Sequence, residues 1–544
     1  MNLVVKDTSF NYKDRIIFDS INLKLSQGEF ICLVGANGAG KSTLLKLIFG
    51  DLKPISGEIF IEDSHNKRVK NLVQNISYLP SNIDNPLYWN RDSFDRELDR
   101  VYDICVGCRL CFNLCPSFPA LFDAIDRAGD EKRIRAVGEG RIGEQISKKD
   151  YISLPEGEHA VEASVEVEFR GEISDLTNQQ RWTVVDLCYQ CKLCDPVCPY
   201  TPGKEHEFQL DFPKLMTRAQ AIRSKEQGIK VNDKFLSNTD FVGKMGSVFG
   251  PVINLFNRIR LLRIIMEKII GIHRERILPE YQTITFSKWF DTHQSTIKDP
   301  VDKVVIFGTC FTNAHDVELG KASVEILEHS GVECKYPFQQ CCGAPYLSPG
   351  DFEGFKNQAE PNIKELSRWV DNGYKVIVTG PPTCSLTLKK EYPDYLGLKE
   401  KIKKISENTF DISEYLVYLN KRGKLKTDFK NPIGKVNYHV SCHLKAQQMG
   451  FKGRDVLRLV PETQINLVNR CSGMDGGWGM KSEFFEESME LADRCIKDLQ
   501  QKQADKVCSD CSLAIHQLEQ AGEGKLVISH PILELYKAYG FNNN

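Results

Sequence analysis

Two cysteine runs, each spaced Cys-x2-Cys-x2-Cys-x3-Cys-Pro, limit what this chain of 544 residues can fold into. Three cysteines at intervals of three wrap a turn around one cubane iron–sulfur cluster, and the fourth, before a proline, points to a second cluster. Zinc sites pair two Cys-x2-Cys units and need no triple run, so two [4Fe–4S] clusters are the better interpretation. The spacing predicts crossed ligation. One cluster takes Cys105, Cys108, Cys111 and Cys198, and the other takes Cys188, Cys191, Cys194 and Cys115.

Composition narrows the class of protein further. The net charge of −2 lacks the excess of basic residues that is typical of a nucleic-acid-binding protein. The sequence has no run of about 18 uncharged apolar residues, so it predicts no transmembrane span. The chain holds 19 cysteines, and Met1 leads into a strand-like segment with no visible signal peptide. We therefore expect metal binding in a reducing cytoplasm, with a peripheral position on the inner face of the membrane left open.

A glycine-rich loop follows an apolar strand-like segment near the N-terminus. In such a loop backbone N–H groups cradle phosphates, a lysine reaches the outer phosphates and a hydroxyl coordinates Mg²⁺. The pattern predicts a site for ATP and Mg²⁺, with Lys41 and Ser42 in the two named roles. The residues expected at this site are Gly35, Asn37, Gly38, Gly40, Lys41, Ser42 and Thr43.

Residues 1–83 resemble the start of an ABC-transporter ATPase. Tyr12 matches the aromatic residue that stacks on adenine in that family, and the segments 54–59 and 76–80 match as well. The motif likeness stops after Pro80, because the signature motif, the acidic Walker B strand and the switch histidine do not follow. The resemblance implies a partial P-loop NTPase sheet that does not hydrolyse ATP alone and that leaves ATP binding open.

The segments 84–216 and 217–300 differ in character. The first carries both cysteine runs, with a long insertion between them, and resembles a bacterial-ferredoxin-like two-cluster module that is largely helical. The second is predicted to be a helical connector. It has apolar residues at helical spacing from Leu255 to Ile269, with Arg258, Arg260, Arg263 and Lys268 among them. This stripe either packs on the protein itself or rests on anionic lipid or on a membrane subunit.

The C-terminal half contains two diverged copies of one α/β unit, at 301–410 and 435–544, joined by a linker at 411–434. Strands alternate with helices, and cysteines follow strands, where such folds place their sites. Gly343 and Gly473 are expected to need positive φ or a close backbone approach. The candidate cluster ligands are Cys310, Cys341, Cys342 and Cys384 in the first copy and Cys442, Cys471, Cys508 and Cys511 in the second.

The two copies resemble the cysteine-rich CCG domain pair of the heterodisulfide reductase family. Each copy keeps four of the five expected thiols, because Pro381 and Ser472 stand where the family has cysteines. Four thiols suffice for a cluster, so the resemblance implies one or two further iron–sulfur clusters. The alternative is that one or both sets are plain structural thiols. His443 is expected either to act on a cluster sulfur or proton, or to make a structural hydrogen bond.

The fold class predicted from these segments is a multidomain α/β and α+β protein, with a partial P-loop sheet, a ferredoxin-like module and two tandem CCG repeats. Residues 85–540 resemble iron–sulfur oxidoreductase subunits related to heterodisulfide reductase and to anaerobic glycerol-3-phosphate dehydrogenase. The resemblance implies an electron-transfer subunit that takes electrons from a flavoprotein dehydrogenase partner and passes them toward quinone or another acceptor. The alternative is a catalytic reductase of a disulfide-type substrate.

Overall fold

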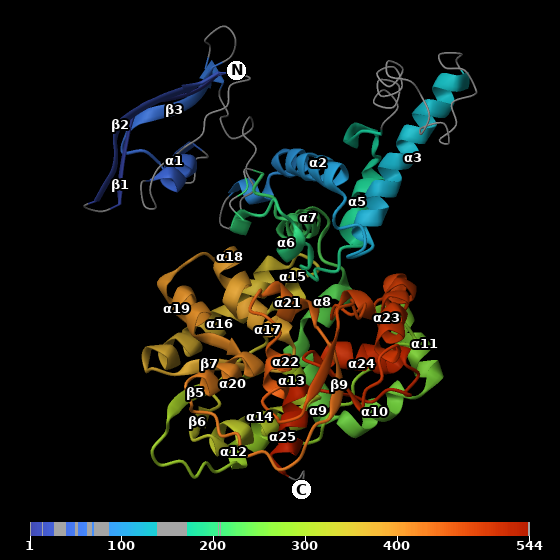
Figure 1. Ribbon diagram of the computed structural model, residues 1–544. Coiled ribbons are helices and arrows are strands. Elements are labelled where there is room, and N and C mark those ends of the chain that lie inside the picture. The colour runs from blue at the N-terminus through green and yellow to red at the C-terminus, as the bar shows by residue number, and fades with distance from the viewer. Residues whose placement is uncertain are drawn as a thin grey trace, which may run out of the picture. The chain divides into compact units, whose positions relative to one another are not determined.

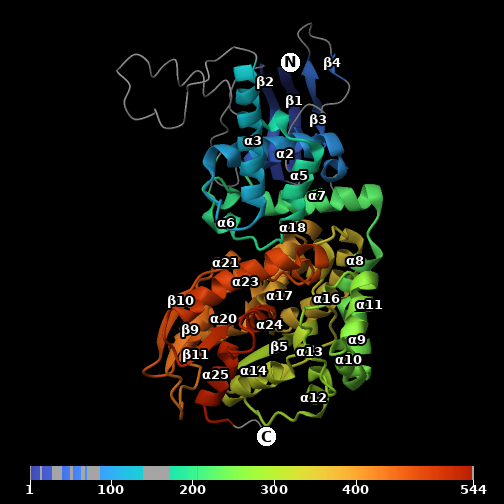
Figure 2. The ribbon, with the colours of Figure 1, turned by 90° about the vertical axis from the view of Figure 1, so that its right-hand side faces the viewer.

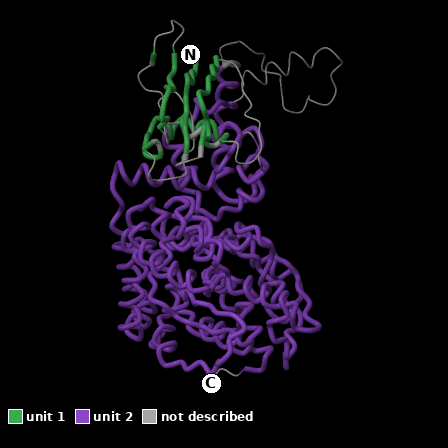
Figure 3. The backbone as a smooth tube through the Cα atoms, turned by 90° about the vertical axis from the view of Figure 1, so that its left-hand side faces the viewer, with its two compact units in different colours: residues 1–101 green, residues 102–544 purple. Residues whose placement is uncertain are grey.

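The computed structural model describes residues 2–12, 15–26, 40–48, 53–62, 68–69, 86–138, 171–204, 206 and 208–541. Two compact units divide the chain, residues 1–101 and 102–544 (Figure 3).

Unit 1 contains an antiparallel sheet in the order β2-β1-β3-β4. Helix α1 covers it, since Leu44 and Ile48 are buried against Val5. Gly40, directly before α1, has a φ of 90°, and a Cβ there would meet the side chains of Ile17 and Phe18 within 3 Å. The elements are β1 (Asn2–Tyr12), β2 (Arg15–Leu25), α1 (Lys41–Ile48), β3 (Ser56–Glu62) and β4 (Arg68–Val69).

The predicted nucleotide site is described only in part. Gly35, Asn37 and Gly38 lie outside the described residues. Lys41, Ser42 and Thr43 form the first turn of α1, as a phosphate-binding loop requires, and Tyr12 ends β1.

A helical segment carries the two cysteine runs. Asp211 caps α7 by accepting a hydrogen bond from the Lys214 amide, and Thr177 caps α5 in the same way through Gln180. Helix α3 packs against α5. The helices are α2 (Arg91–Cys108), α3 (Ser117–Gly138), α5 (Asn178–Asp186), α6 (Cys194–Val197) and α7 (Phe212–Gln227).

The connector after α7 is a series of short helices rather than one long one. Helix α10 begins with Gly250 and Pro251, and the chain breaks again at Arg258 and Ile259 before α11. Helices α8 to α11 follow one another along one side of unit 2 (Figure 2). They are α8 (Val231–Ser237), α9 (Thr239–Val248), α10 (Gly250–Asn257) and α11 (Arg260–Ile270), and α12 (Phe286–Thr292) comes after them.

The first repeat is a parallel sheet in the order β6-β5-β7-β8 with helices packed around it (Figure 1). Its central strand β5 is buried over most of its length, as expected for a parallel strand covered on both faces. Its strands are β5 (Asp302–Gly308), β6 (Val332–Lys335), β7 (Lys375–Thr379) and β8 (Thr409–Asp411). Its helices are α13 (Cys310–Ala314), α14 (Val317–His329), α15 (Ala344–Leu347), α16 (Phe352–Asp371), α17 (Pro382–Leu386), a π-helical turn (Thr387–Glu391), α18 (Tyr392–Leu396) and α19 (Glu400–Asn408).

The second repeat has the same strand order, β10-β9-β11-β12, again all parallel. This shared topology confirms the internal repeat predicted from the sequence. Its strands are β9 (Lys435–His439), β10 (Gln464–Val468), β11 (Lys506–Ser509) and β12 (Ile528–Ser529). Its helices are α21 (Cys442–Ala446), α22 (Lys452–Leu457), α23 (Phe485–Gln500), α24 (Ser512–Ala521) and α25 (Pro531–Ala538), with short 3₁₀ turns at Trp478–Met480 and Ser482–Phe484.

One hydrophobic core joins the two repeats. It contains Val304 and Ile306 of the first sheet together with Val436 and Tyr438 of the second. The segment 411–434 is more than the linker predicted from the sequence. It begins with α20 (Ile412–Lys421), whose apolar side chains lie in this same core, so the repeats pack as one body.

Candidate metal centre

The two cysteine runs approach each other in the crossed way that the spacing predicts. Cys105 and Cys108 lie in the last turn of α2, and Cys111 follows in a turn. Cys111 interacts electrostatically with Cys108 and with Cys198 of the other run, and burial raises its pKa to about 12. Cys198 also receives a hydrogen bond from the Tyr200 amide at 3.4 Å. The fourth thiol of the second run therefore lies beside thiols of the first.

The reciprocal arrangement holds for Cys115. Burial, and then the neighbouring Cys188, raise the pKa of the Cys115 thiol to about 12. Cys191 and Cys194 both interact with Cys115, and burial raises their pKa values well above the usual range. Buried thiols of this kind stay neutral until a metal replaces their protons, so a metal cluster suits this site better than free thiolates.

The loops of both runs contain residues in left-handed backbone conformation. Arg109, Gln190 and Lys192 have φ values of 52°, 54° and 59°. Each such residue costs of order 1–3 kcal/mol, and strain of this kind collects where a chain wraps a ligand. The backbone of both cysteine turns therefore already has the conformation that wrapping a cluster requires.

The four predicted thiols of the first repeat form one buried group. Cys310 follows β5, and its sulfur lies 4.0 Å from that of Cys341. Hydrogen bonds from Cys310 and Cys342 hold the pKa of Cys341 well below its usual range. Cys342 in turn interacts with Cys384 in the middle of α17. Because the Gly343 amide donates to Cys341 Sγ at 3.5 Å, the group offers both thiols and an N–H donor.

The second repeat gathers three of its four predicted thiols. Cys442 interacts with Cys471 and Cys511, and burial raises its pKa well above the usual range. The Gly473 amide donates to Cys471 Sγ at 3.2 Å. Cys508 lies apart, within β11, where it is fully buried in the hydrophobic core shared by the repeats. Its position in a strand, rather than in the loop after the strand, separates it from the other three.

Two glycines beside these thiols have the backbone conformation that the sequence predicts. Gly343 and Gly473 have φ values of 93° and 73°. A Cβ at Gly473 would lie 2.1 Å from the Ser488 carbonyl oxygen, and one at Gly343 would lie 2.8 Å from the Phe355 ring. Only glycine fits at these two turns.

His443 makes a structural junction between three segments. Its Nε2 donates to the Gln190 carbonyl at 3.0 Å, since a carbonyl can only accept, and its Nδ1 therefore accepts from Thr383 Oγ1 at 2.8 Å. Thr383 precedes Cys384, and Gln190 lies within the second cysteine run. Of the two predicted roles for His443, the structure shows the hydrogen-bonding one.

Taken together, the thiols form a continuous series. Cys198 interacts with Cys111, and Cys111 with Cys194 of the second run. Cys191 interacts with Cys471 and Cys442 of the second repeat, and Cys511 of that repeat interacts with Cys384 of the first. The series therefore runs from the ferredoxin-like segment through the second repeat to the first.

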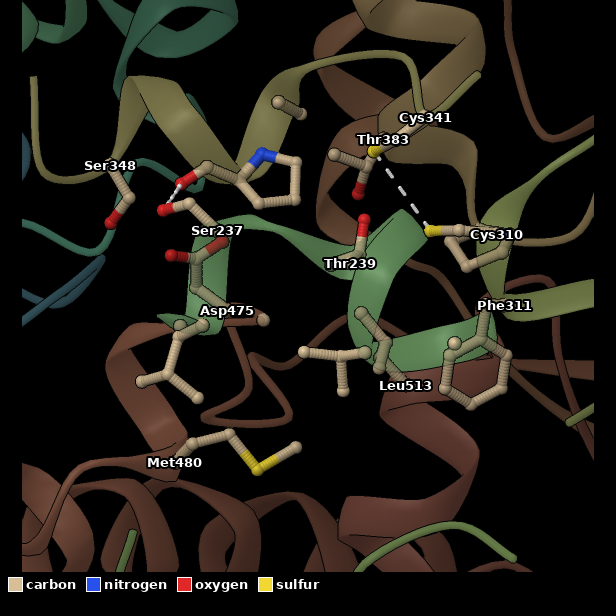
Figure 4. Close-up of a pocket in the computed structure, with 18 of the residues that line it drawn as sticks. Ser237, Thr239, Cys310, Phe311, Cys341, Ser348, Thr383, Asp475, Met480 and Leu513 are labelled. Carbon is tan, nitrogen blue, oxygen red and sulfur yellow. Dashed lines mark hydrogen bonds between the residues drawn. The ribbon is translucent and has the colours of Figure 1, made fainter. Parts of the chain in front are cut away.

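A cavity of about 570 Å³ lies beside the first repeat's thiols. Figure 4 shows Thr239, Cys310 and Cys341 facing the same space. Its other walls come from α8 to α11 and from residues around Asp475. Within the described residues, no three His, Cys, Asp or Glu side chains converge on a point as they would around a single metal ion. A cluster instead spreads its thiolates over several irons.

Several contacts at this site have no signal in the sequence. Tyr189 donates from its hydroxyl to Cys471 Sγ at 3.2 Å. Lys192 pairs with Glu391 deep inside the protein, and burial lowers the pKa of Lys192 to about 8. These partners are separated by about two hundred residues or more, so only folding brings them together.

Fold and thiols together define a class: proteins with paired cysteine-rich α/β domains. The family model of the cysteine-rich domain matches residues 304–389 and 436–518, one match in each repeat. The model of the ABC transporter family matches residues 18–158. This match extends beyond Pro80, the last residue of the ABC-type motifs found in the sequence.

The chain is similar to subunits of two oxidoreductases and to a lactate utilization protein. Over 306 residues it is 27% identical to a subunit of the anaerobic glycerol-3-phosphate dehydrogenase of Escherichia coli K12, covering 56% of this chain and 76% of that protein. Over 250 residues it is 28% identical to a subunit of the fumarate reductase (CoM/CoB) of Methanothermobacter marburgensis, covering 44% and 47%. Over 220 residues it is 28% identical to lactate utilization protein A of Geobacillus sp. WCH70, covering 38% and 87%.

Proposed function

We propose that this protein is the iron–sulfur electron-transfer subunit of an oxidoreductase, and that it receives electrons from a flavoprotein dehydrogenase subunit. The observation that carries the proposal is the continuous series of thiols from Cys198 to Cys310. Iron–sulfur clusters, when bound, supply one-electron redox chemistry. The similar proteins include one subunit of a dehydrogenase and one of a fumarate reductase, which suits this role.

The proposed clusters follow the crossed pattern. Cys105, Cys108, Cys111 and Cys198 would hold one [4Fe–4S] cluster, and Cys115, Cys188, Cys191 and Cys194 the other. Cys310, Cys341, Cys342 and Cys384 would hold a third. Cys442, Cys471 and Cys511 would hold a fourth with three thiolates, and Cys508 would remain a core residue.

The chain's own residues would protect and connect these groups. Tyr189, Leu193 and Trp478 are buried around Cys191 and Cys471 and exclude water from the junction. The His443 hydrogen bonds fix the second run against both repeats. Lys192 places a buried cation near the thiolates, and it would offset part of their negative charge.

Anaerobic purification with iron quantitation and EPR tests the proposal. About sixteen irons per chain would mean four loaded sites, and about eight would mean that only the two cysteine runs are loaded. A colourless, iron-free protein obtained with sulfide and iron supplied would end the proposal.

We also propose that the connector rests on a membrane. In the described chain no helix is long and apolar enough to cross a bilayer. Helices α9 to α11 nevertheless expose many apolar side chains, which we call the apolar face. They are Phe241, Met245, Val248, Phe249, Val252, Leu255, Phe256, Ile259, Leu261, Ile265 and Ile269.

The charges on these helices favour anionic lipid as the partner of the apolar face. The exposed charged residues of α9 to α11 and of the break between α10 and α11 are all cations: Lys244, Arg258, Arg260 and Lys268. Arg258 pairs with Glu280 just outside these helices, so the lipid attraction is assigned to the other three. Both carboxylates face inward. Asp240 accepts from the Cys341 amide, and Glu267 accepts from Arg274 and Ser482. A surface that is apolar and cationic binds the interface of an anionic leaflet, as the inner face of a cytoplasmic membrane provides.

The N-terminal segment would retain ATP and Mg²⁺ binding without hydrolysis. The first turn of α1 supplies Lys41, Ser42 and Thr43, but the chain lacks the signature and Walker B motifs. Equilibrium dialysis of labelled ATP with wild type and Lys41→Ala tests this proposal. Equal retention of ATP by both proteins would contradict it.

A further inference from the structure

The cavity beside the first repeat's thiols opens to the surface at a defined place. Phe235, Phe241 and Met245 line the cavity, and they are also 40%, 54% and 42% exposed. A side chain can line a cavity and face solvent at once only at its rim. The mouth therefore lies between α8 and α9.

The surroundings of this mouth decide how a ligand would arrive. Phe241 and Met245 belong to the apolar face, which continues over α10 and α11. Inside, the same helices line the cavity with Val242, Ile253 and Met266. A ligand would thus pass from an apolar surface into an apolar passage, a route that suits a molecule dissolved in lipid and disfavours a charged, water-soluble one.

The inner part of the cavity offers a few polar groups. Asn257 lines it, and its Oδ1 atom is buried without a hydrogen-bond partner. Such an atom costs free energy unless a ligand satisfies it. A ligand hydroxyl would donate to Oδ1, and a ligand carbonyl would accept from Nδ2 once the carboxamide has turned. Tyr281 lines the cavity as well and interacts with Cys310. Gly246 lets the Tyr281 ring approach α9, since a Cβ there would lie 2.0 Å from the ring.

The far end of the cavity is the thiol group of the first repeat. A cluster held by Cys310, Cys341, Cys342 and Cys384 would occupy that end. The part lined by α8 to α11 would remain for a ligand. Ligand pockets of about 300–1,000 Å³ are typical, mostly apolar with few polar groups.

We propose that this cavity binds the ring of a lipid-soluble quinone, which enters from the bilayer between Phe235 and Phe241 and meets Tyr281 and Asn257 through its carbonyl oxygens. The inference rests on the proposed electron-transfer function. Reduction of one quinone to quinol takes two electrons and two protons. The electrons come one at a time from the substrate of the partner dehydrogenase, and the protons come from water.

Photolabelling of the anaerobically purified holoprotein tests the proposal. The probe is an azido derivative of 2-methyl-1,4-naphthoquinone, and labelled peptides are mapped with and without excess 2-methyl-1,4-naphthoquinone. We expect label within residues 235–281, removed by the competitor. Val242→Trp fills the passage and should reduce this labelling at least tenfold. Val231→Trp makes the same change at an exposed position of α8 and should leave it unchanged.

Asn257→Leu keeps the protein foldable, because it replaces a polar atom that has no partner with apolar volume. It should weaken competition by the quinone roughly threefold to tenfold, the usual effect of one hydrogen bond. Tyr281→Phe should have an effect of the same size.

The outcomes separate this inference from the proposed function. Loaded clusters with label spread over the surface, or with labelling unchanged in Val242→Trp, would overturn the quinone site and leave the electron relay standing. Stronger competition by glutathione disulfide than by the quinone would overturn it in favour of a disulfide substrate. Absence of clusters would instead overturn the proposed function.

Discussion

The hydroxyl of Tyr189 donates a hydrogen bond to Cys471 Sγ at 3.2 Å. Tyr189 belongs to the second cysteine run, and Cys471 to the second repeat, 282 positions further along the chain. This contact is the closest polar link between the ferredoxin-like segment and a thiol of the repeats that the structure describes. In the proposed electron relay, the second repeat would therefore receive electrons from the cysteine runs.

Removal of this hydroxyl should change a reduction potential without removing a cluster. A hydrogen bond to sulfur stabilises the more negative, reduced state, so Tyr189→Phe should lower the potential of the second repeat's cluster. A loss of about 0.5–1.5 kcal/mol corresponds to roughly 20–65 mV for one electron. Redox titration followed by EPR measures it. The control Tyr374→Phe removes a hydrogen bond to Glu333 that involves none of the proposed cluster ligands. It should leave every reduction potential unchanged.

Single thiol substitutions should show the crossed ligation. Cys115→Ala should remove the cluster associated with Cys188, Cys191 and Cys194, because Cys115 lies beside them. Cys198→Ala should remove the other one, since Cys198 lies beside Cys108 and Cys111. Iron content and EPR of both variants check the pair. Loss of the cluster of its own run in each variant would refute the crossing.

Cation removal on the connector should release the protein from lipid. Each basic residue near an anionic surface contributes about 1 kcal/mol, so neutralising Lys244, Arg260 and Lys268 to Gln should weaken binding roughly a hundredfold. Co-sedimentation with vesicles containing phosphatidylglycerol measures the effect. The matched control neutralises Lys399, Lys401 and Lys403 on and beside α19, and it should bind like wild type. An equal loss of vesicle binding in both variants would show that only the net charge of the protein attracts it to the lipid, and would contradict a specific role for the connector.

Arg263 behaves differently from its neighbours, although the sequence places it in the same stripe. Its guanidinium is buried and donates to the carbonyls of His273, Arg274 and Arg276. Arg263→Gln should therefore destabilise the fold, by about 3 kcal/mol, because three buried acceptors lose their donor. Thermal unfolding measures this change. Wild-type stability together with weaker vesicle binding would place Arg263 on the lipid surface instead.

Buried histidine makes stability depend on pH. Burial lowers the pKa of His439 to about 4, against about 6.5 in an unfolded chain. The unfolded chain therefore takes up this proton first as the pH falls. The stability from the neutral ring is complete above about pH 6.5 and is lost toward pH 4, at about 1.4 kcal/mol per pH unit.

His439→Gln should lose this contribution to the pH dependence. Unfolding midpoints between pH 7.5 and pH 5 should fall less steeply in the variant than in wild type. Parallel slopes for the two proteins would show that the ring takes up its proton at the same pH in the folded and unfolded states, and would contradict the prediction.

Local sequence patterns determined much of this protein. The spacing of the cysteine runs predicted the crossed approach of Cys115 and Cys198. Alternating strands and helices predicted two parallel α/β repeats. The glycines Gly343 and Gly473 predicted turns with positive φ. These features depend on neighbours close in the chain, where residue spacing directly sets geometry.

Tertiary structure alone decided the rest. The sequence could not separate Cys508 from its three partners, because the choice between strand and loop depends on how β11 pairs with β9. It could not show that the Arg263 side chain is buried or that Tyr189 meets Cys471. Nor could it show that Ile259 and Ile269 of the connector's apolar stripe are exposed while Met266 lines the cavity. Such contacts form between residues remote in sequence, and packing of the whole core sets which side chains meet.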